Sequence, residues 1–345
     1  MKNGNSAMVR RINREVIRNA LKARGSANIA ELSRLTRLSP ATCSNILPEL
    51  ILDGEVFELD ERQSGGGRPA RVYAYNPDHT LVAAILLRYG ADRTTIRHSV
   101  RNSAGAVISA GLASPEPFTL EALDEVLDRL IRDHPAIRVL ALSIPGVVEN
   151  GTVELCDVVE LWGVNMEERL KSRFSLETVM ENDMNFAAVG YASRHPEAAR
   201  SGLAYINIPE GKCPGCGIVV GGRLLKGKSN FAGELSYIPF AGAPKEPFRH
   251  GDRSAVVEVA ARLCCVLAAA VNPDAVVIAG DVVGEDMAGD IRAWCLDHIP
   301  GHHLPEIIAQ HDYEEDCFDG MLAMALEALS CDVRLVEKKR SWSGG

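Results

Sequence analysis

Two short segments carry residue types that could perform chemistry. Asp183 precedes the apolar segment 186–192, which we expect to be helical. A carboxylate at that place can accept a hydrogen bond from a ligand hydroxyl, or it can cap the helix. The second segment, Cys213-Pro-Gly-Cys216, has a spacing that suits metal or redox chemistry, but such a site needs further ligands. No second cysteine pair stands nearby in the sequence, so we expect no metal there.

The composition is that of a globular protein with more than one domain. The chain has 345 residues, of which 46% are hydrophobic and 24% are charged. No apolar run is long enough to span a membrane, and the N-terminus lacks the apolar core of a secretory signal. We therefore expect a cytoplasmic protein without membrane contact. Its nine cysteines should then be reduced, with Cys264 and Cys265 as small core residues.

The charge is unevenly distributed. Residues 1–75 carry a net charge of +4 and the rest of the chain −13, while the first 45 residues hold nine basic and two acidic side chains. A basic segment joined to an acidic body is typical of a DNA-binding module attached to a domain that does not touch DNA. Chance clustering on one solvated helix would give the same pattern.

Local patterns predict three helices near the N-terminus. Apolar residues recur at helical spacing over 9–24. A second helix is expected after Asn28, with Glu31 completing a capping box, and a third after Ser39, with Pro40 at its first position. The side chains expected to face inward are Ile12, Val16, Ile17, Ala20, Leu21, Leu32, Leu35, Leu38, Ile46, Leu47 and Leu50.

The helices and the segment after them predict a winged helix-turn-helix. Residues 55–58 and 71–75 resemble two strands joined by a glycine-rich basic tip over 63–69. Two residues fit less well: Arg37 stands where a turn glycine would be comfortable, and Pro48 should kink or end the third helix. A small helical protein-interaction module is the alternative. The residues expected to contact DNA are Arg34, Arg37, Thr42, Ser44, Asn45 and Arg68.

From residue 76 onward, strand-like and helix-like segments alternate. Buried strands are expected at 81–87, 139–144, 203–208, 217–220 and 275–279. Amphipathic or apolar helices are expected around 120–131 and 254–271. This alternation predicts an α/β body, in two lobes with a ligand cleft between them.

The chain resembles the ROK family (repressor, open reading frame, kinase), and within it the xylose and N-acetylglucosamine repressors. The resemblance rests on the Gly-Gly-Gly-Arg-Pro wing, Ser143-Ile-Pro-Gly146, the segment from Glu181 to Asn185, and Ala232-Gly-Glu234, which occur in the family's order. It implies a two-lobed body similar to actin and hexokinase (ribonuclease H-like), with sugar in the interlobe cleft. It also implies a homodimer or homotetramer.

The resemblance also implies roles for individual residues. Gly146 matches a turn beneath the sugar, where a glycine lets the backbone approach closely. Asn182 would hold sugar hydroxyls, and Asp183 matches the base of the family's kinases. Glu234 matches a second acidic sugar contact.

The departures from the family pattern argue against phosphoryl transfer. The kinases have Asp-x-Gly-Gly-Thr where this chain reads Leu86-Leu-Arg-Tyr-Gly-Ala-Asp-Arg-Thr94, which lacks the paired glycine and the preceding aspartate. Lys212 and Cys213 alter the second glycine loop, Gly211–Gly217. Tyr237 replaces a zinc-ligating histidine, and no cysteine follows it in 238–250. We therefore expect no enzyme activity, no ATP binding and no zinc, with Asp183 a vestige of the base.

These observations predict a transcriptional regulator, expected to be a repressor of carbohydrate metabolism, that binds a double-stranded DNA operator and a sugar or sugar-phosphate effector. The expected domains are 1–75 for DNA binding, 76–338 for the kinase-like body, and a disordered tail at 339–345. Two alternatives stay open: a ligand-independent regulator whose body serves only for dimerisation, and an active sugar kinase.

Overall fold

The computed structural model describes residues 2–62, 70–90, 93–238 and 252–329. It divides into two compact units. The N-terminal unit runs to Thr80 and includes Asn102–Ala104, and the unit called the body here holds Leu81–Arg101 and Gly105–Leu329. Within the described ranges, no helix combines the length and apolarity that crossing a bilayer requires.

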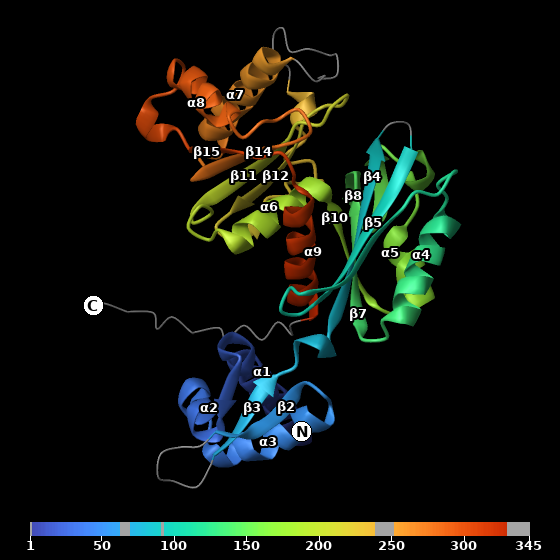
Figure 1. Cartoon of the computed structure of the whole chain (residues 1–345), viewed down its shortest axis with the longest axis vertical. Helices are drawn as coiled ribbons and strands as arrows, with labels where there is room; N and C mark the ends of the chain where they lie inside the picture. The colour runs from blue at the N-terminus through green and yellow to red at the C-terminus, as the bar shows by residue number, and fades with distance from the viewer. Residues whose placement is uncertain (1, 63–69, 91–92, 239–251, 330–345) are drawn as a thin grey trace, which may run out of the picture. The chain divides into compact units, whose positions relative to one another are not determined.

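The N-terminal unit packs three helices on a small antiparallel sheet of order β1-β3-β2 (blue in Figure 1). Its core includes Ile17, Leu21, Leu32, Leu47 and Leu50, each at most 1% exposed. In chain order its elements are α1 (Lys2–Arg24), β1 (Ser26–Asn28), α2 (Ile29–Thr36), α3 (Pro40–Leu52), β2 (Val56–Arg62), β3 (Ala70–Tyr75) and the 3₁₀ turn η1 (Pro77–His79).

Both predicted helix starts in this unit are confirmed. Asn28 and Glu31 form a reciprocal capping box, in which each side chain accepts a hydrogen bond of 2.9 Å from the other residue's backbone amide. Ser39 caps α3 by accepting from the amide of Thr42 at 3.1 Å. Arg37 has a φ of 58°, the left-handed conformation for which glycine is better suited.

The expected inward position of Leu35 is wrong, and so is an early end of α3 at Pro48, one of the two effects expected of that proline. Leu35 does not face inward, because its side chain is 48% exposed. Pro48 does not end α3, which continues to Leu52. Pro48 lies on the exposed side of α3, so the carbonyl that loses its partner at that turn can be hydrated, which lowers the penalty of an interior proline.

The predicted hairpin is present, since β2 and β3 pair antiparallel from Val56↔Tyr75 to Arg62↔Ala70. The wing tip at 63–69, with Arg68, lies outside the described residues.

The body contains two five-stranded mixed sheets and a two-stranded ribbon, β8-β9. The first sheet has the order β10-β7-β4-β5-β6 and the second β13-β12-β11-β14-β15. Parallel pairing joins β10, β7 and β4 in the first sheet and β11, β14 and β15 in the second. The strands are β4 (Leu81–Gly90), β5 (Arg93–Asn102), β6 (Val107–Ala113), β7 (Ile137–Ile144), β8 (Gly146–Glu149), β9 (Thr152–Cys156), β10 (Glu177–Asn182), β11 (Gly202–Asn207), β12 (Gly215–Val220), β13 (Arg223–Leu224), β14 (Ala275–Ala279) and β15 (Glu306–Ala309).

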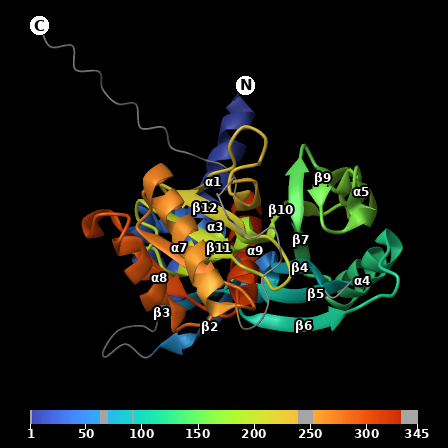
Figure 2. The ribbon, with the colours of Figure 1, turned by 90° about the horizontal axis from the view of Figure 1, so that it is seen from above.

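Helices cover both faces of each sheet, as Figures 1 and 2 show. Helices α6 and α9 pack between the sheets in one shared core. Helices α4 and α5 cover the other face of the first sheet, and α7 and α8 the other face of the second. The helices are α4 (Leu120–Asp133), α5 (Met166–Phe174), α6 (Asp183–Arg194), α7 (Arg253–Ala270), α8 (Met287–Leu296) and α9 (Glu314–Leu329), and the short 3₁₀ turns are η2 (Val159–Leu161), η3 (Leu235–Tyr237) and η4 (Gly301–His303).

The central strands are apolar on both faces because both faces are covered. In β4, Val82, Ala84 and Leu86 face α6 and α9, whereas the alternate residues, such as Ala83 and Ile85, face α4 and α5. The alternation of β11 follows the same rule against α7 and α8. Each apolar run predicted as a strand is therefore a strand with both faces buried.

Helices α6 and α9 cross in close backbone contact. A Cβ on Gly190 would lie 1.8 Å from the carbonyl oxygen of Asp316, and one on Gly320 would lie 1.8 Å from that of Phe186. Only glycine fits at either position. This contact sets how the start of α6, which carries Asp183, lies against α9.

Candidate functional site

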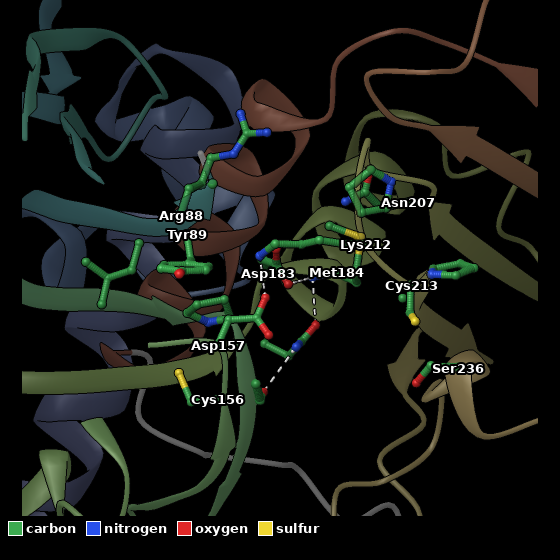
Figure 3. A pocket seen from close by; sticks show the side chains of 18 of the residues that line it. Arg88, Tyr89, Cys156, Asp157, Asp183, Met184, Asn207, Lys212, Cys213 and Ser236 are labelled. Carbon is green, nitrogen blue, oxygen red and sulfur yellow. Dashed lines mark hydrogen bonds and ion pairs between the residues drawn. The ribbon is translucent and has the colours of Figure 1, made fainter. Parts of the chain in front are cut away.

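A cavity of about 800 Å³ lies in the body and is lined from both sheets. It brings together Gly146, Asn182, Asp183 and Glu234, the residues expected to bind a ligand, although they are far apart in the sequence. Figure 3 shows Asp183 with Arg88, Tyr89 and Asp157 on one side and Lys212, Cys213 and Ser236 on the other.

Asn182 joins the end of β10 to the start of α6. Its side-chain oxygen accepts from the amide of Met184 at 2.8 Å and so caps the helix. Its side-chain nitrogen donates to the carbonyl oxygen of Gly146 at 3.1 Å. The helix expected over 186–192 thus begins earlier, at Asp183, and Asn182 is its capping residue. These two bonds orient Asn182 at the cavity wall.

Asp183 is the half-buried carboxylate of the cavity. One oxygen accepts from the amide of Met184 at 3.0 Å, and the other faces the hydroxyl of Tyr313 at 3.5 Å. Burial raises the pKa of Asp183 to about 6, against the opposing effects of the Met184 amide, Arg88 and Lys212. The sequence did not identify Tyr313 as a neighbour, because it precedes α9, far along the chain.

The raised pKa of Asp183 predicts a pH-dependent cost to stability. Its ordinary pKa is 3.8, so between about pH 4 and 6 the folded state keeps a proton that the unfolded chain releases. The stability that this proton contributes is present below about pH 4 and is lost as the pH rises through about 6. Asp183→Asn should therefore raise the Tm by about 2–4 °C at about pH 8 and by much less at about pH 4.5. Thermal melts at both pH values measure the difference; an equal shift at both would contradict it.

Glu234 presents a carboxylate whose hydrogen-bonding capacity is not used by the described part of the chain. Burial raises its pKa, and the charges of Asp183 and Asp157 raise it further. Its backbone position is fixed by Gly233, which has a φ of 96° and where a Cβ would lie 2.0 Å from the carbonyl oxygen of Cys216. A half-buried carboxylate of this kind is suited to accept hydrogen bonds from ligand hydroxyls.

Gly146 lines the cavity, but its small size serves the fold. A Cβ there would lie 1.8 Å from the carbonyl oxygen of Leu155 on β9. The ribbon turns at Asn150 and Gly151, whose φ values of 50° and 79° suit a tight hairpin. Close approach of β9 therefore requires a glycine at this position.

Arg88 stands at the cavity end of β4, in the stretch that departs from the kinase pattern. Its guanidinium donates to Glu314 at 2.5 Å, lies 3.9 Å from Asp281 and stacks over the ring of Tyr313 at 5.2 Å. Arg97 also pairs with Glu314, at 3.1 Å. The described end of β4 therefore supplies a fixed cation, where magnesium binding would require a carboxylate.

The segment from Lys212 into β12 contains a close packing contact with α6. A Cβ on Gly217 would lie 2.1 Å from the carbonyl oxygen of Met184, so β12 packs directly on the first turn of α6. Burial raises the pKa of Cys216 to about 12, whereas Cys213 is exposed. Lys212 pairs with Asp157 and lies 4.9 Å from the ring centre of Tyr89. Among the residues that the structure describes, no group of His, Cys, Asp and Glu could hold a metal ion.

The residues expected to contact DNA lie on α2, the turn and α3. Ser44 and Asn45 are exposed and share an outer stripe of α3 with Ala41 and Pro48. Thr42 is half-buried, and its hydroxyl contacts that of Ser39 at 2.8 Å. Arg34 and Arg37 are exposed and form no ion pair with any described residue. Arg68 is outside the described residues.

Most other arginines of the N-terminal unit have acidic partners. Arg14 pairs with Asp53 and with Glu55 at 2.9 Å, and Arg18 also reaches Glu55, at 3.2 Å. Arg10 pairs with Glu49, and Arg24 with Glu31. The basic character that the sequence showed is thus partly neutralised along α1, which leaves Arg34 and Arg37 as the exposed cations beside α3.

Comparison with known proteins places these features in a family. The sequence profile of the ROK family matches residues 87–251. The xylose repressor of Caldicellulosiruptor bescii is 26% identical over 245 residues, which cover 68% of this chain and 60% of that repressor. The match thus spans less than two thirds of the relative.

Solved structures show the same fold. A ROK family transcriptional regulator, described as a homologue of the Escherichia coli MLC protein, aligns with 92% of this chain and 99% of its own at a TM-score of 0.63 and 17% identity. The ROK family glucokinase of Streptomyces griseus, in complex with glucose and AMPPNP, aligns with 71% of this chain and 99% of its own at a TM-score of 0.53 and 17% identity. Residues 87–251 therefore match the ROK family, and the fold is the one found in ROK family proteins.

Proposed function

We propose that the chain is a transcriptional repressor that binds operator DNA through its N-terminal unit and a sugar or sugar phosphate in the cavity of its body. The observation that carries the DNA-binding part is the uncharged outer stripe of α3 beside Arg34 and Arg37, two exposed arginines without an ion pair to any described residue. In a helix-turn-helix, polar side chains on the second helix contact bases while cations contact phosphates. The name of the xylose repressor relative supports the same function.

The effector would bind to Asn182, Asp183 and Glu234, with Gly146 in the wall beneath. The carboxylates accept hydrogen bonds from hydroxyl groups, and the Asn182 amide is held ready by its own two bonds. A ligand that prefers one closure of the cavity shifts the body toward that state. In a homodimer or homotetramer, such a shift would change the spacing of the DNA-binding units and hence the affinity for the operator.

The body would bind its ligand without transferring phosphate. Phosphoryl transfer depends on metal ions and backbone amides placed around the phosphates. The Arg88 guanidinium, held by Glu314, opposes a divalent cation at the end of β4. Neither ATP nor zinc is part of the proposal.

Sugar binding and phosphoryl transfer would be measured in parallel. A thermal-shift screen of sugars and sugar phosphates should find a ligand that raises the Tm of the wild type but not of Glu234→Ala. The same sugars with magnesium-ATP should give no phosphorylated product. Product that forms with the wild type and disappears in Asp183→Asn would establish a kinase instead. A full screen without any thermal shift would favour a body that serves only for dimerisation.

A further inference from the structure

Trp162 is an exposed aromatic residue at the wall of the cavity. Its side chain is 55% exposed, although tryptophan is on average a highly buried residue. Its indole N–H donates to the carbonyl oxygen of Cys156 at 2.6 Å. Because the single polar atom of the ring is satisfied by the protein, the exposed part that remains is an apolar surface in a fixed orientation.

The β8-β9 ribbon positions both Trp162 and part of the predicted ligand site. Cys156, which accepts from the indole, lies opposite Gly146 in the β8-β9 ribbon. The carbonyl oxygen of Gly146 in turn accepts from the side chain of Asn182. One ribbon therefore fixes the aromatic ring and the amide, so the two are set in a defined arrangement along one wall of the cavity.

A second apolar side chain accompanies Trp162 at this wall. Leu155, one residue before Cys156 on β9, lines the cavity and is 42% exposed. The polar groups come from other elements: Asn182 and Asp183 from the start of α6, and Glu234 from the loop before η3. The ribbon and the turn after it thus add apolar side chains to a wall whose polar groups come from α6 and the loop before η3.

A carbohydrate of more than one ring fits this division. A sugar ring has hydroxyl groups around its edge and C–H groups on its faces, so carboxylates and amides bind the edge while aromatic rings stack on the faces. A cavity of about 800 Å³ is near the upper end of the range of about 300–1,000 Å³ for small-molecule sites, where drug-sized ligands bind. A monosaccharide is smaller than such a ligand.

We propose that Trp162 and Leu155 form a second subsite, which stacks on the second ring of a disaccharide or glycoside whose first ring binds Asn182, Asp183 and Glu234. This inference rests on the proposed function, because it requires the cavity to bind a carbohydrate. Beyond the proposed function, it states that the ligand has two sugar rings and that Trp162 selects for the second ring.

Affinities of matched sugars test the subsite. Calorimetric titration of the full chain would compare xylose, glucose and N-acetylglucosamine with xylobiose, cellobiose, maltose and chitobiose. The best disaccharide should bind about tenfold more tightly than its monosaccharide, which corresponds to about 1.4 kcal/mol. Trp162→Ala should remove this preference and leave the monosaccharide affinity within about twofold. Glu234→Ala should weaken both ligands.

Fluorescence locates the contact independently. The chain has three tryptophans, and in a Trp294→Phe, Trp342→Phe background only Trp162 emits. The disaccharide should change the emission of this variant more than the monosaccharide does. Trp294, which stacks on His298 at 3.9 Å and does not line the cavity, provides the control: a chain that keeps only Trp294 should not respond.

The outcomes separate the subsite from the proposed function. Monosaccharide binding without any gain from a second ring, or an equal loss for both ligands in Trp162→Ala, would overturn the subsite and leave the effector site in place. If none of these sugars binds the wild type, the subsite is rejected together with a neutral sugar as effector.

Discussion

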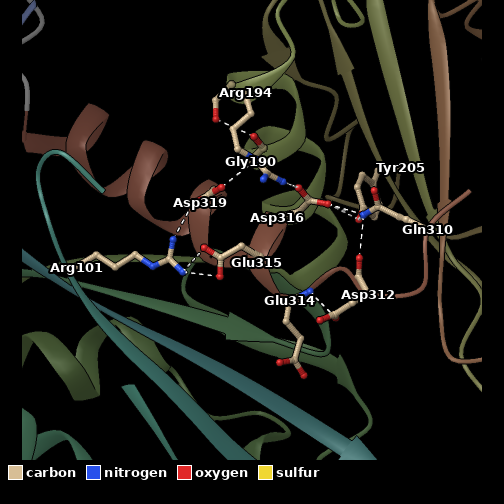
Figure 4. Close-up of polar contacts among 11 residues, drawn as sticks. Arg101, Gly190, Arg194, Tyr205, Gln310, Asp312, Glu314, Glu315, Asp316 and Asp319 are labelled. Atoms are coloured by element: carbon tan, nitrogen blue, oxygen red, sulfur yellow. Dashed lines mark hydrogen bonds and ion pairs between the residues drawn. The ribbon is translucent and has the colours of Figure 1, made fainter. Parts of the chain in front are cut away.

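Asp316→Ala is expected to lower the free energy of unfolding of the body by about 3 kcal/mol. Asp316 is 3% exposed and accepts hydrogen bonds of 2.7 Å from both the Tyr205 hydroxyl and the Gln310 side chain. It also pairs with Arg194 of α6, as Figure 4 shows. Alanine would leave the buried hydroxyl without an acceptor, which is costly in the interior. It would also remove one of the two acidic partners of Arg194, whose side chain is 43% exposed and keeps Asp319.

Urea denaturation followed by circular dichroism measures this loss. Asp128→Ala is the matched control, because the Asp128–Arg173 pair is exposed on both sides, at 41% and 44%, and solvent screening leaves such a pair little effect on stability. If Asp316→Ala does not fold, Asp316→Asn keeps an acceptor for Tyr205 and should show an intermediate loss. Equal effects of Asp316→Ala and Asp128→Ala would contradict the role given to this cluster.

Asn45→Ala should relax the DNA sequence preference of the chain by about 1–3 kcal/mol at one base position. Asn45 is exposed on the outer stripe of α3, and its amide can form paired hydrogen bonds with an adenine edge. The measurement is selection of bound duplexes from a random library, followed by titration of the selected site and of variants at each position.

Arg34 and Arg37 provide the contrasting variant for that experiment. Their exposed guanidinium groups should contact phosphates, so the double replacement by alanine should weaken binding to all sequences alike. It should also reduce the slope of log K against log salt by about 2. If Asn45→Ala shows the same preference as the wild type between the selected site and its single-position variants, the Asn45 side chain of α3 does not contact a base.

Local signals in the sequence predicted the helix starts well. The capping box at Asn28 and Glu31 and the cap at Ser39 depend on residues within one turn of each other, so adjacent sequence is sufficient to identify them. Leu35 and Pro48 were misjudged because their effect depends on which side of the helix the rest of the unit covers. That coverage is set by tertiary packing.

The candidate site was predicted only in part, for the same reason. Asn182, Asp183 and Glu234 were identified through family motifs. Arg88, which lowers the pKa of Asp183, and Tyr313, whose hydroxyl faces it, come from β4 and from the segment just before α9. Their sequence separation leaves no local pattern. The pairing of charges is equally hidden in the sequence, since Arg10 and Arg14 of α1 meet their acidic partners on and just after α3.

The most direct test of the account is the affinity of the chain for its selected operator, measured with and without a sugar that raises its Tm. The sugar should change the operator Kd of the wild type by about 5–150-fold. It should not change that of Glu234→Ala, whose operator affinity without sugar should equal that of the wild type. An operator affinity that no Tm-raising sugar alters would contradict the account.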